Sequence, residues 1–177
     1  MSNQDLLQRE NRMLACLSSL PRRMLTLHGI DNVTEFVLHD LCHEHCFNFN
    51  KAAYFVDNGD FNCTKGVAGF SRDERFAKND AIWEDPIAFS HHMKESAFNK
   101  RVRQMDRCSL KHLNDGHASM AAEMAHDLGF TNYAFCSWSM KHDNDGFVLY
   151  EKADVADTFA DQYLMNGLSL LSFCPIF

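Results

Sequence analysis

Four side chains of the kinds that bind zinc fall within the eight-residue stretch HDLCHEHC. They are His39, Cys42, His43 and Cys46. Their spacing places them on one face of a predicted helix. Ligands in a line along one helix cannot surround an ion tetrahedrally, and a structural zinc site takes ligands from two elements. His91 and His92 could be a second contributor, but nothing in the sequence fixes their distance. The pattern therefore favours a helix surface over a metal site.

A carboxylate within an apolar run is the second candidate for chemistry. The segment AIWEDPIAF, residues 81–89, is apolar apart from its central letters EDP. Asp before Pro commonly begins a turn, so a capping or turn-forming Asp85 is one interpretation. The other is a carboxylate buried at a pocket wall, where Trp83 and Ile87 leave few protein donors and a ligand amide N–H would supply one. Local sequence leaves both open.

Motifs of the common enzyme classes are absent from the sequence. There is no P-loop, GxGxxG, HExxH or GxSxG pattern. Seven Cys and ten His allow a Cys–His pair in principle, but no local signature singles out one Cys. We therefore expect no catalytic activity, no cofactor and no bound metal.

Composition and charge indicate a soluble globular chain of the cytoplasm. The 177 residues are 46% hydrophobic and 23% charged, which is enough for one domain over residues 1–177. The N-terminus is polar and is not a secretory signal, so the cysteines are expected to be reduced. A net charge of −7 argues against direct binding of nucleic acid.

Hydrophobic periodicity and turn signals predict alternating helices and hairpins. A first helix is expected at 4–19, ended by Pro21, and a second at about 31–47, capped by Asp31 or Asn32. The further elements expected are a hairpin at 52–70 with a DNGD turn, a helix or loop at 71–80, helices at 97–105 and 117–130, a hairpin at 132–152 and a last helix from about 154 to 171. Gly129 should end the helix predicted within 117–130, as its C′ residue. Two separated hairpins with helices between them predict one antiparallel sheet with helices against its faces.

Two of these segments resemble one known family. RFAKNDAIWEDPI resembles the aromatic-(x)8-Asp-Pro-[Val/Ile] element in the autoinducer-binding domain of LuxR-type quorum-sensing receptors. AAEMAHDLGFTNYAFCSWSMKHDNDGFVLYEKAD resembles that family's passage from a helix through Gly to two strands joined by a turn. The order and separation of both segments fit, over about residues 10–172. The resemblance implies an α/β/α sandwich that binds an acyl-homoserine lactone between the sheet and the helices.

The resemblance also implies roles for individual residues. Asp85 would accept a hydrogen bond from the amide N–H of the ligand, and Phe76 stands where the family has a Tyr beside the acyl chain. Arg72 stands where the family has a Trp that donates to the lactone carbonyl, and Trp83 is a candidate replacement. Glu151 lies near the Ser or Thr that faces the amide carbonyl. The other expected ligand-lining residues are Tyr54, Phe70, Ile87, Phe135 and Phe147.

The sequence is therefore interpreted as a cytoplasmic sensor domain of a LuxR-type transcription regulator, which binds an acyl-homoserine lactone or a similar small amphipathic signal. We expect a homodimer through the first or last helix, and DNA binding only through a helix-turn-helix domain that this sequence lacks. The chain is then either a fragment of a longer regulator or a stand-alone domain. Alternatives are a GAF- or PAS-like sensor, a protein-interaction (anti-activator) module with a filled core and, third, a small enzyme.

Overall fold

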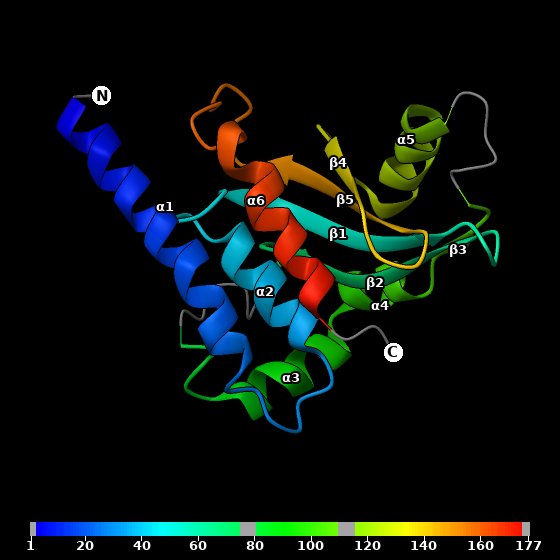
Figure 1. The fold of residues 1–177 in the computed structure, drawn as a ribbon, viewed down its shortest axis with the longest axis horizontal. Helices are drawn as coiled ribbons and strands as arrows, with labels where there is room; N and C mark the ends of the chain where they lie inside the picture. The colour runs from blue at the N-terminus through cyan, green and yellow to red at the C-terminus, as the bar shows by residue number, and fades with distance from the viewer. Residues whose placement is uncertain (1–2, 75–80, 110–115, 175–177) are drawn as a thin grey trace.

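A five-stranded antiparallel sheet forms the middle layer of the protein, between two layers of helices (Figure 1). The computed structural model describes residues 3–74, 81–109 and 116–174. The strands lie in the order β3-β2-β1-β5-β4. They are β1 (Phe49–Asn58), β2 (Cys63–Ser71), β3 (Asp106–Arg107), β4 (Ala134–Ser139) and β5 (Asn144–Lys152). The expected α/β/α sandwich with a central antiparallel sheet is confirmed.

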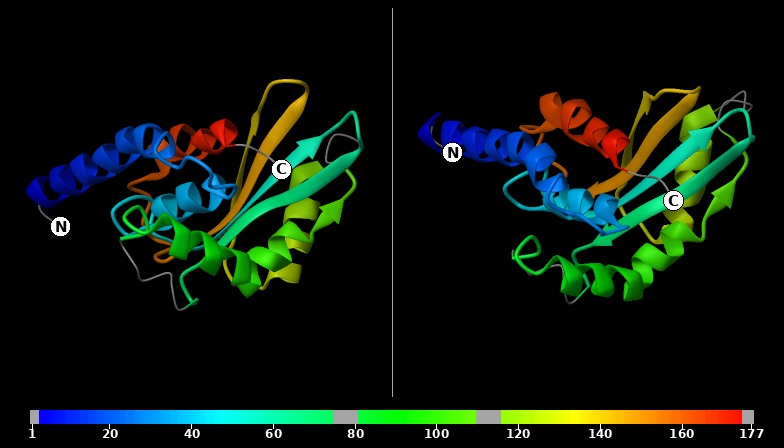
Figure 2. Two further views of the ribbon diagram at one scale, coloured as in Figure 1. Left: turned by 90° about the horizontal axis from the view of Figure 1, so that it is seen from below. Right: turned by 60° about the horizontal axis from the view of Figure 1, so that its bottom comes forward.

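The helices divide between the two faces of the sheet (Figure 2). They are α1 (Asn3–Met24), α2 (Val33–Cys42), α3 (Pro86–Glu95), α4 (Ala97–Arg103), α5 (Gly116–Leu128) and α6 (Leu164–Leu168), with 3-10 turns η3 (Asp161–Tyr163) and η4 (Ser169–Phe173). The first face carries α1, α2, α6 and η4, and the second carries α4 and α5. Of the helices in the described ranges, none is both long and apolar enough to cross a bilayer.

Alternation along the central strands explains why both faces are covered. Successive side chains of a strand point to opposite faces. Tyr54 of β1 and Val148 of β5 lie in the core beneath α2, whereas Phe55 and Phe147 lie in the core beneath α4 and α5. A strand buried on both faces is apolar throughout, and the AAYFV run of β1 has that character.

The core on the second face is filled by side chains, and we call it the α4–α5 cluster. Its members include Phe55, Val102, Met120, Met124 and Phe147, each at most 9% exposed. Glycines of β2 allow α4 to approach closely, because a Cβ at Gly66 would lie 1.8 Å from the carbonyl oxygen of Val102. The space between the sheet and the helices α4 and α5 is therefore occupied by packed side chains.

Several predicted elements are confirmed. Both hairpins are present, and Gly129 follows α5 with a φ of 72°, the left-handed conformation expected of a C′ residue. The helix expected at 97–105 is α4. The residues 75–80 of the expected helix or loop lie outside the described ranges. The two-residue strand β3 was not predicted, because two residues carry no readable alternation.

Three predicted helix boundaries were wrong. α1 continues through Pro21 to Met24, because a proline in the last turn removes only one internal hydrogen bond. α2 ends at Cys42 and not near residue 47, since His43 adopts an extended ψ of 151°. The last helix, expected from about residue 154, begins at Asp161 as short 3-10 and α segments, and Val155 before it is 64% exposed.

The close approach of α4 to β2 predicts that Gly66→Ala is strongly destabilising. The added methyl group meets backbone and not a movable side chain, so the helix must shift away from the strand. We expect a loss of about 3 kcal/mol in the free energy of unfolding, measured by urea denaturation. The neighbouring exposed Lys65→Ala is the control and should change little. Equal stability of both variants would contradict the close packing of α4 on β2.

Candidate functional site

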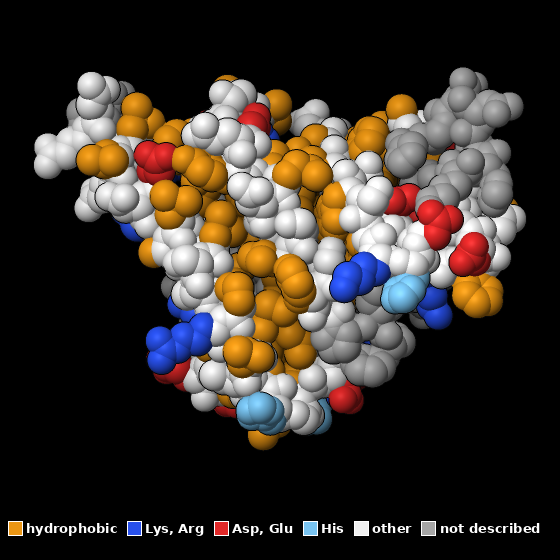
Figure 3. Space-filling model, in the orientation of Figure 1, with side chains coloured by type: hydrophobic (Ala, Val, Ile, Leu, Met, Phe, Trp, Pro, Cys, Tyr) orange, Lys and Arg blue, Asp and Glu red, His pale blue; other side chains and the backbone are white. Residues whose placement is uncertain are grey.

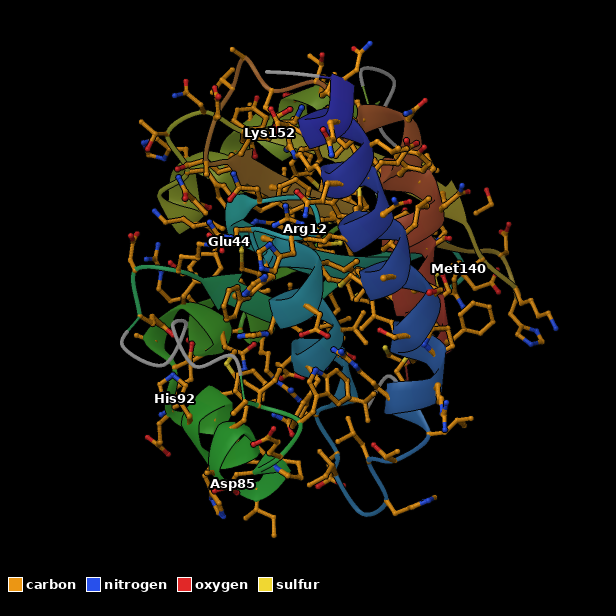
Figure 4. The ribbon with its side chains drawn as sticks, turned by 90° about the vertical axis from the view of Figure 1, so that its left-hand side faces the viewer. Arg12, Glu44, Asp85, His92, Met140 and Lys152 are labelled. Carbon is orange, nitrogen blue, oxygen red and sulfur yellow. The ribbon has the colours of Figure 1, made fainter. Side chains whose placement is uncertain are left out.

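Asp85 is an exposed helix cap in the structure. It is the N-cap residue of α3, and its Oδ1 accepts a hydrogen bond from the backbone N–H of Ala88 at 3.1 Å. Figure 4 shows it at the outer end of α3, at the edge of the molecule. Pro86 occupies the first helical position, where its missing N–H costs nothing. The prediction of a carboxylate buried in an apolar cavity was therefore wrong, and the capping interpretation is confirmed.

The two candidate donors for a lactone are engaged within the protein. Trp83 Nε1 donates to Asp40 Oδ2 at 3.0 Å. Arg72 donates through Nη1 to Asn48 Oδ1 and through Nη2 to the carbonyl oxygen of Cys42, each at 2.7 Å. Both side chains join loops and strands to α2, which is a structural role.

The other predicted ligand-lining residues do not converge on one site. Tyr54 and Phe70 lie in the core of the first face, whereas Phe147, with the half-buried Phe135 against it, belongs to the α4–α5 cluster. Ile87 is 63% exposed on α3. Glu151 Oε2 accepts a hydrogen bond from the backbone N–H of Thr131. Phe76 lies outside the described residues.

The His- and Cys-rich stretch does not form one helix face, contrary to the sequence analysis. α2 ends at Cys42, so His43 and Cys46 belong to the turn that follows it. His39 is buried, with its Nδ1 3.2 Å from Asp40 Oδ1. Within the described part of the chain, no group of three or more His, Cys, Asp or Glu residues is arranged to hold a metal ion.

A polar cleft of about 700 Å³ lies where the start of α2 meets β2, α3 and α4. It is the strongest candidate for a binding site. Its lining residues are Asp31, Asn32, Thr34, Glu35, Val67, Lys94, Asn99, Lys100, Arg103 and Gln104. Of these, Val67 is the one hydrophobic side chain. Cavities of this volume are typical of sites for small molecules.

Glu35 is the buried carboxylate of this cleft, and only one of its two oxygens has hydrogen-bond partners among the described residues. It is 1% exposed, and its Oε1 accepts hydrogen bonds from Asn99 Nδ2 at 3.1 Å and Arg103 Nη1 at 3.0 Å. Its Oε2 has no hydrogen-bond partner among the described residues. Burial raises the pKa of Glu35 above its ordinary value, and the bonds from Asn99 and Arg103 oppose this rise.

Asn32, the residue before α2, contributes a second buried atom without a partner. Its Oδ1 accepts a hydrogen bond from Ser90 Oγ at 2.6 Å, but its Nδ2 has no acceptor within the described ranges. The side chain also makes no capping bond to the start of α2. Buried polar groups in native proteins are nearly always paired with protein groups or ordered water, so these two atoms, on residues of one cleft, are places for partners from outside the protein chain.

Charges of both signs surround the cleft. Lys94, Lys100 and Arg103 are exposed on α3 and α4, and Asp31 and Glu35 lie on the α2 side. The N-terminus of α2 also faces the cleft and adds a partial positive charge. This arrangement can bind and orient a polar or charged molecule.

A second cleft of about 450 Å³ lies between α1 and α2 and includes Cys16, Arg23 and Asp40. Its central carboxylate is fully engaged, because Asp40 Oδ2 accepts from Arg23 Nη1 at 2.7 Å and from Trp83 Nε1. The first cleft, whose residues Asn32 and Glu35 each have a buried atom without a hydrogen-bond partner in the described structure, is therefore the stronger candidate.

Sequence reasoning did not single out Asn32 or Glu35 as site residues. One signal was available, since Glu35 interrupts the apolar positions of VTEFVLHDL. A charged residue there is ordinary for a helix with one solvated face, and only the burial of α2 on all sides makes it unusual.

The cap at Asp85 predicts a specific pattern of stability changes. Asp85→Ala should lower the free energy of unfolding by about 1 kcal/mol, or about 2–4 °C in Tm. Asp85→Asn should cost little, because Asn caps helices equally well. Thermal melts followed by circular dichroism measure both, with exposed Glu84→Ala as control. An Asn variant as unstable as the Ala variant would show that capping is not the role of Asp85.

Burial of Glu35 predicts that Glu35→Gln stabilises the protein at neutral pH. A carboxyl group with a raised folded pKa favours folding when protonated, and this contribution is lost as pH rises from its ordinary value of 4.5 through the folded pKa. The variant should therefore match the wild type near pH 4.5 and exceed it at pH 7 by about 1 kcal/mol, or 2–4 °C in Tm.

The control for this prediction is Glu44→Gln, since Glu44 is exposed just beyond the other end of α2 (Figure 4). Its stability relative to the wild type should not change with pH in this way. A Glu35→Gln variant less stable than the wild type at pH 7 would show that the bonds from Asn99 and Arg103 outweigh the cost of burial.

Comparisons with known proteins found no relative of this chain. No family model matches the sequence, and neither the curated proteins nor the solved structures include a match.

Proposed function

We propose that this chain is a small-molecule sensor domain of LuxR type, and that its ligand binds in the polar cleft at the start of α2. The observation that carries the proposal is the pair of buried, unpartnered atoms, Glu35 Oε2 and Asn32 Nδ2, on residues of one cleft. The α/β/α architecture is the one that the resemblance implies. Signal-dependent control of transcription, through a DNA-binding domain or a partner regulator, is part of this proposal.

The character of the cleft favours a polar signal over a long acyl chain. Burying an acyl chain stabilises a complex by about 25 cal/mol per Å² of apolar surface, and Val67 is the one hydrophobic side chain in the lining of the cleft. The α4–α5 cluster has apolar surface, but its side chains already fill that space. We therefore propose a ligand held by hydrogen bonds and charges.

A protein-interaction module is the second candidate, and an exposed apolar band favours it. Figure 3 shows hydrophobic side chains gathered over α1 and the segment α6–η4. Leu7 and Leu14 of α1, Met165 of α6 and Phe173 of η4 are between 41% and 76% exposed. Such a band on the first and last helices is the surface through which we propose that the chain forms a homodimer.

The sensor proposal predicts that the protein retains a small molecule from a metabolite extract. Purified protein should be incubated with the extract, washed and denatured, and the released compounds identified by mass spectrometry. We expect one compound in near-stoichiometric amount, and a rise in Tm of about 5 °C or more when it is present at 100 times its Kd. Glu35→Gln should release much less of it, and Glu44→Gln the same amount as the wild type.

The sensor proposal is contradicted if the protein retains no compound whose retention depends on Glu35. Size-exclusion chromatography of the same sample then tests the second candidate. A dimer that dissociates on Leu14→Glu, with no retained compound, would favour the interaction module.

A further inference from the structure

The two unpartnered atoms of the cleft require different groups from a ligand. An ionised Glu35 presents Oε2 as an acceptor, and Asn32 presents Nδ2 as a donor. Asn32 is the N-cap residue of α2 and Glu35 lies in its first turn, where Glu35 N donates to the carbonyl oxygen of Asn32 at 3.1 Å. Residues three apart on a helix have Cβ atoms about 5–6 Å apart. One small ligand can therefore reach both atoms if its donor and acceptor lie a few ångströms apart.

Charges around the cleft indicate the sign of each ligand group. The buried Glu35 carboxylate favours a cation at Oε2, because a second positive partner offsets its loss of hydration. Lys94 on α3 and the N-terminus of α2 favour an anion, whereas Lys100 is already paired with Glu95 Oε2 at 2.8 Å. Arg103 is already bonded to Glu35 Oε1, so it positions the carboxylate.

We propose that the cleft binds a small zwitterion, an α-amino acid or a close derivative. Its ammonium group donates to Glu35 Oε2, and its carboxylate accepts from Asn32 Nδ2 and pairs with Lys94. The inference rests on the proposed function, because it names the ligand class of the same cleft. An α-amino acid carries its two charged groups on one carbon atom, which suits two recognition residues that lie three positions apart at the start of α2.

The protein holds the two recognition side chains firmly. Asn99 donates to Glu35 Oε1 and to the carbonyl oxygen of Met93 at 2.9 Å, and its own Oδ1 accepts from the backbone N–H of Gly69 at 2.8 Å. Ser90 fixes Asn32 in the same manner. Glu35 Oε2 and Asn32 Nδ2 are covered in the structure, so the groups around them must move when a ligand enters.

Calorimetry with amino acids and matched analogues tests the inference. For each amino acid that binds, one analogue lacks the charged carboxylate (the amide) and one lacks the ammonium (the deaminated acid). We expect each analogue to bind about 10- to 100-fold more weakly. Glu35→Gln should weaken the binding of the amino acid by a similar factor and leave the binding of the deaminated acid nearly unchanged. Lys94→Ala should weaken the binding of the amino acid about two- to five-fold, and by less at high salt. Glu44→Gln should bind as the wild type does.

The result that overturns the inference is distinguishable from failure of the sensor proposal. If a neutral or singly charged compound from the extract binds in a Glu35-dependent manner and no amino acid does, the cleft is a ligand site but the zwitterion is wrong. Amino acid binding that is indifferent to both Glu35→Gln and Asn32→Ala would also overturn it. If no compound of any class binds, both proposals fail.

Discussion

Burial of α2 on all sides is the constraint on which the rest of the structure depends. Every residue from Val33 to Cys42 is buried, so polar side chains that would face water on an ordinary surface helix must find partners inside the protein. The sheet lies on one side of α2, with α1 and the last helical segment on the other. Asp40 accordingly accepts hydrogen bonds from Arg23 of α1 and from Trp83, which lies before α3. Asp40 thus links α1 and the loop before α3 to the buried helix.

Asn99 has the corresponding role at the other end of α2. Its amide bonds to Gly69 of β2, to Glu35 of α2 and to Met93 of α3, so one side chain on α4 ties three elements together. The glycines of β2 make this possible, because only a strand without side chains at Gly66 and Gly69 lets α4 come close enough. The cleft is therefore a consequence of how α4 docks, and its shape should be preserved as long as that docking is.

Sequence reasoning predicted the layers but not the site, and the reason is physical. Strands with alternating or fully apolar patterns, turn signals such as DNGD and the Gly129 stop are local features, so hairpins and helices could be read from neighbouring residues. The site depends on the contacts of Glu35 with Asn99 and Arg103, both of which lie more than 60 residues further along the chain. Asp85 is different, because the local Asp-Pro pattern did indicate a structural feature. That feature is the cap of α3, and the pattern carried no information about a pocket.

The comparison between Asp40 and Glu35 is the strongest argument that the cleft has a purpose beyond stability. Both are carboxylates on the same buried helix, and both pair with an arginine and one further donor. Asp40 has hydrogen-bonding contacts at both of its oxygens, whereas Glu35 leaves Oε2 without one in the described structure. An unsatisfied buried polar group costs about 1–3 kcal/mol, which is a large share of the stability of a domain. The same helix shows that this fold can satisfy a buried acid completely, so the half-satisfied Glu35 is best explained by a donor that arrives with a ligand.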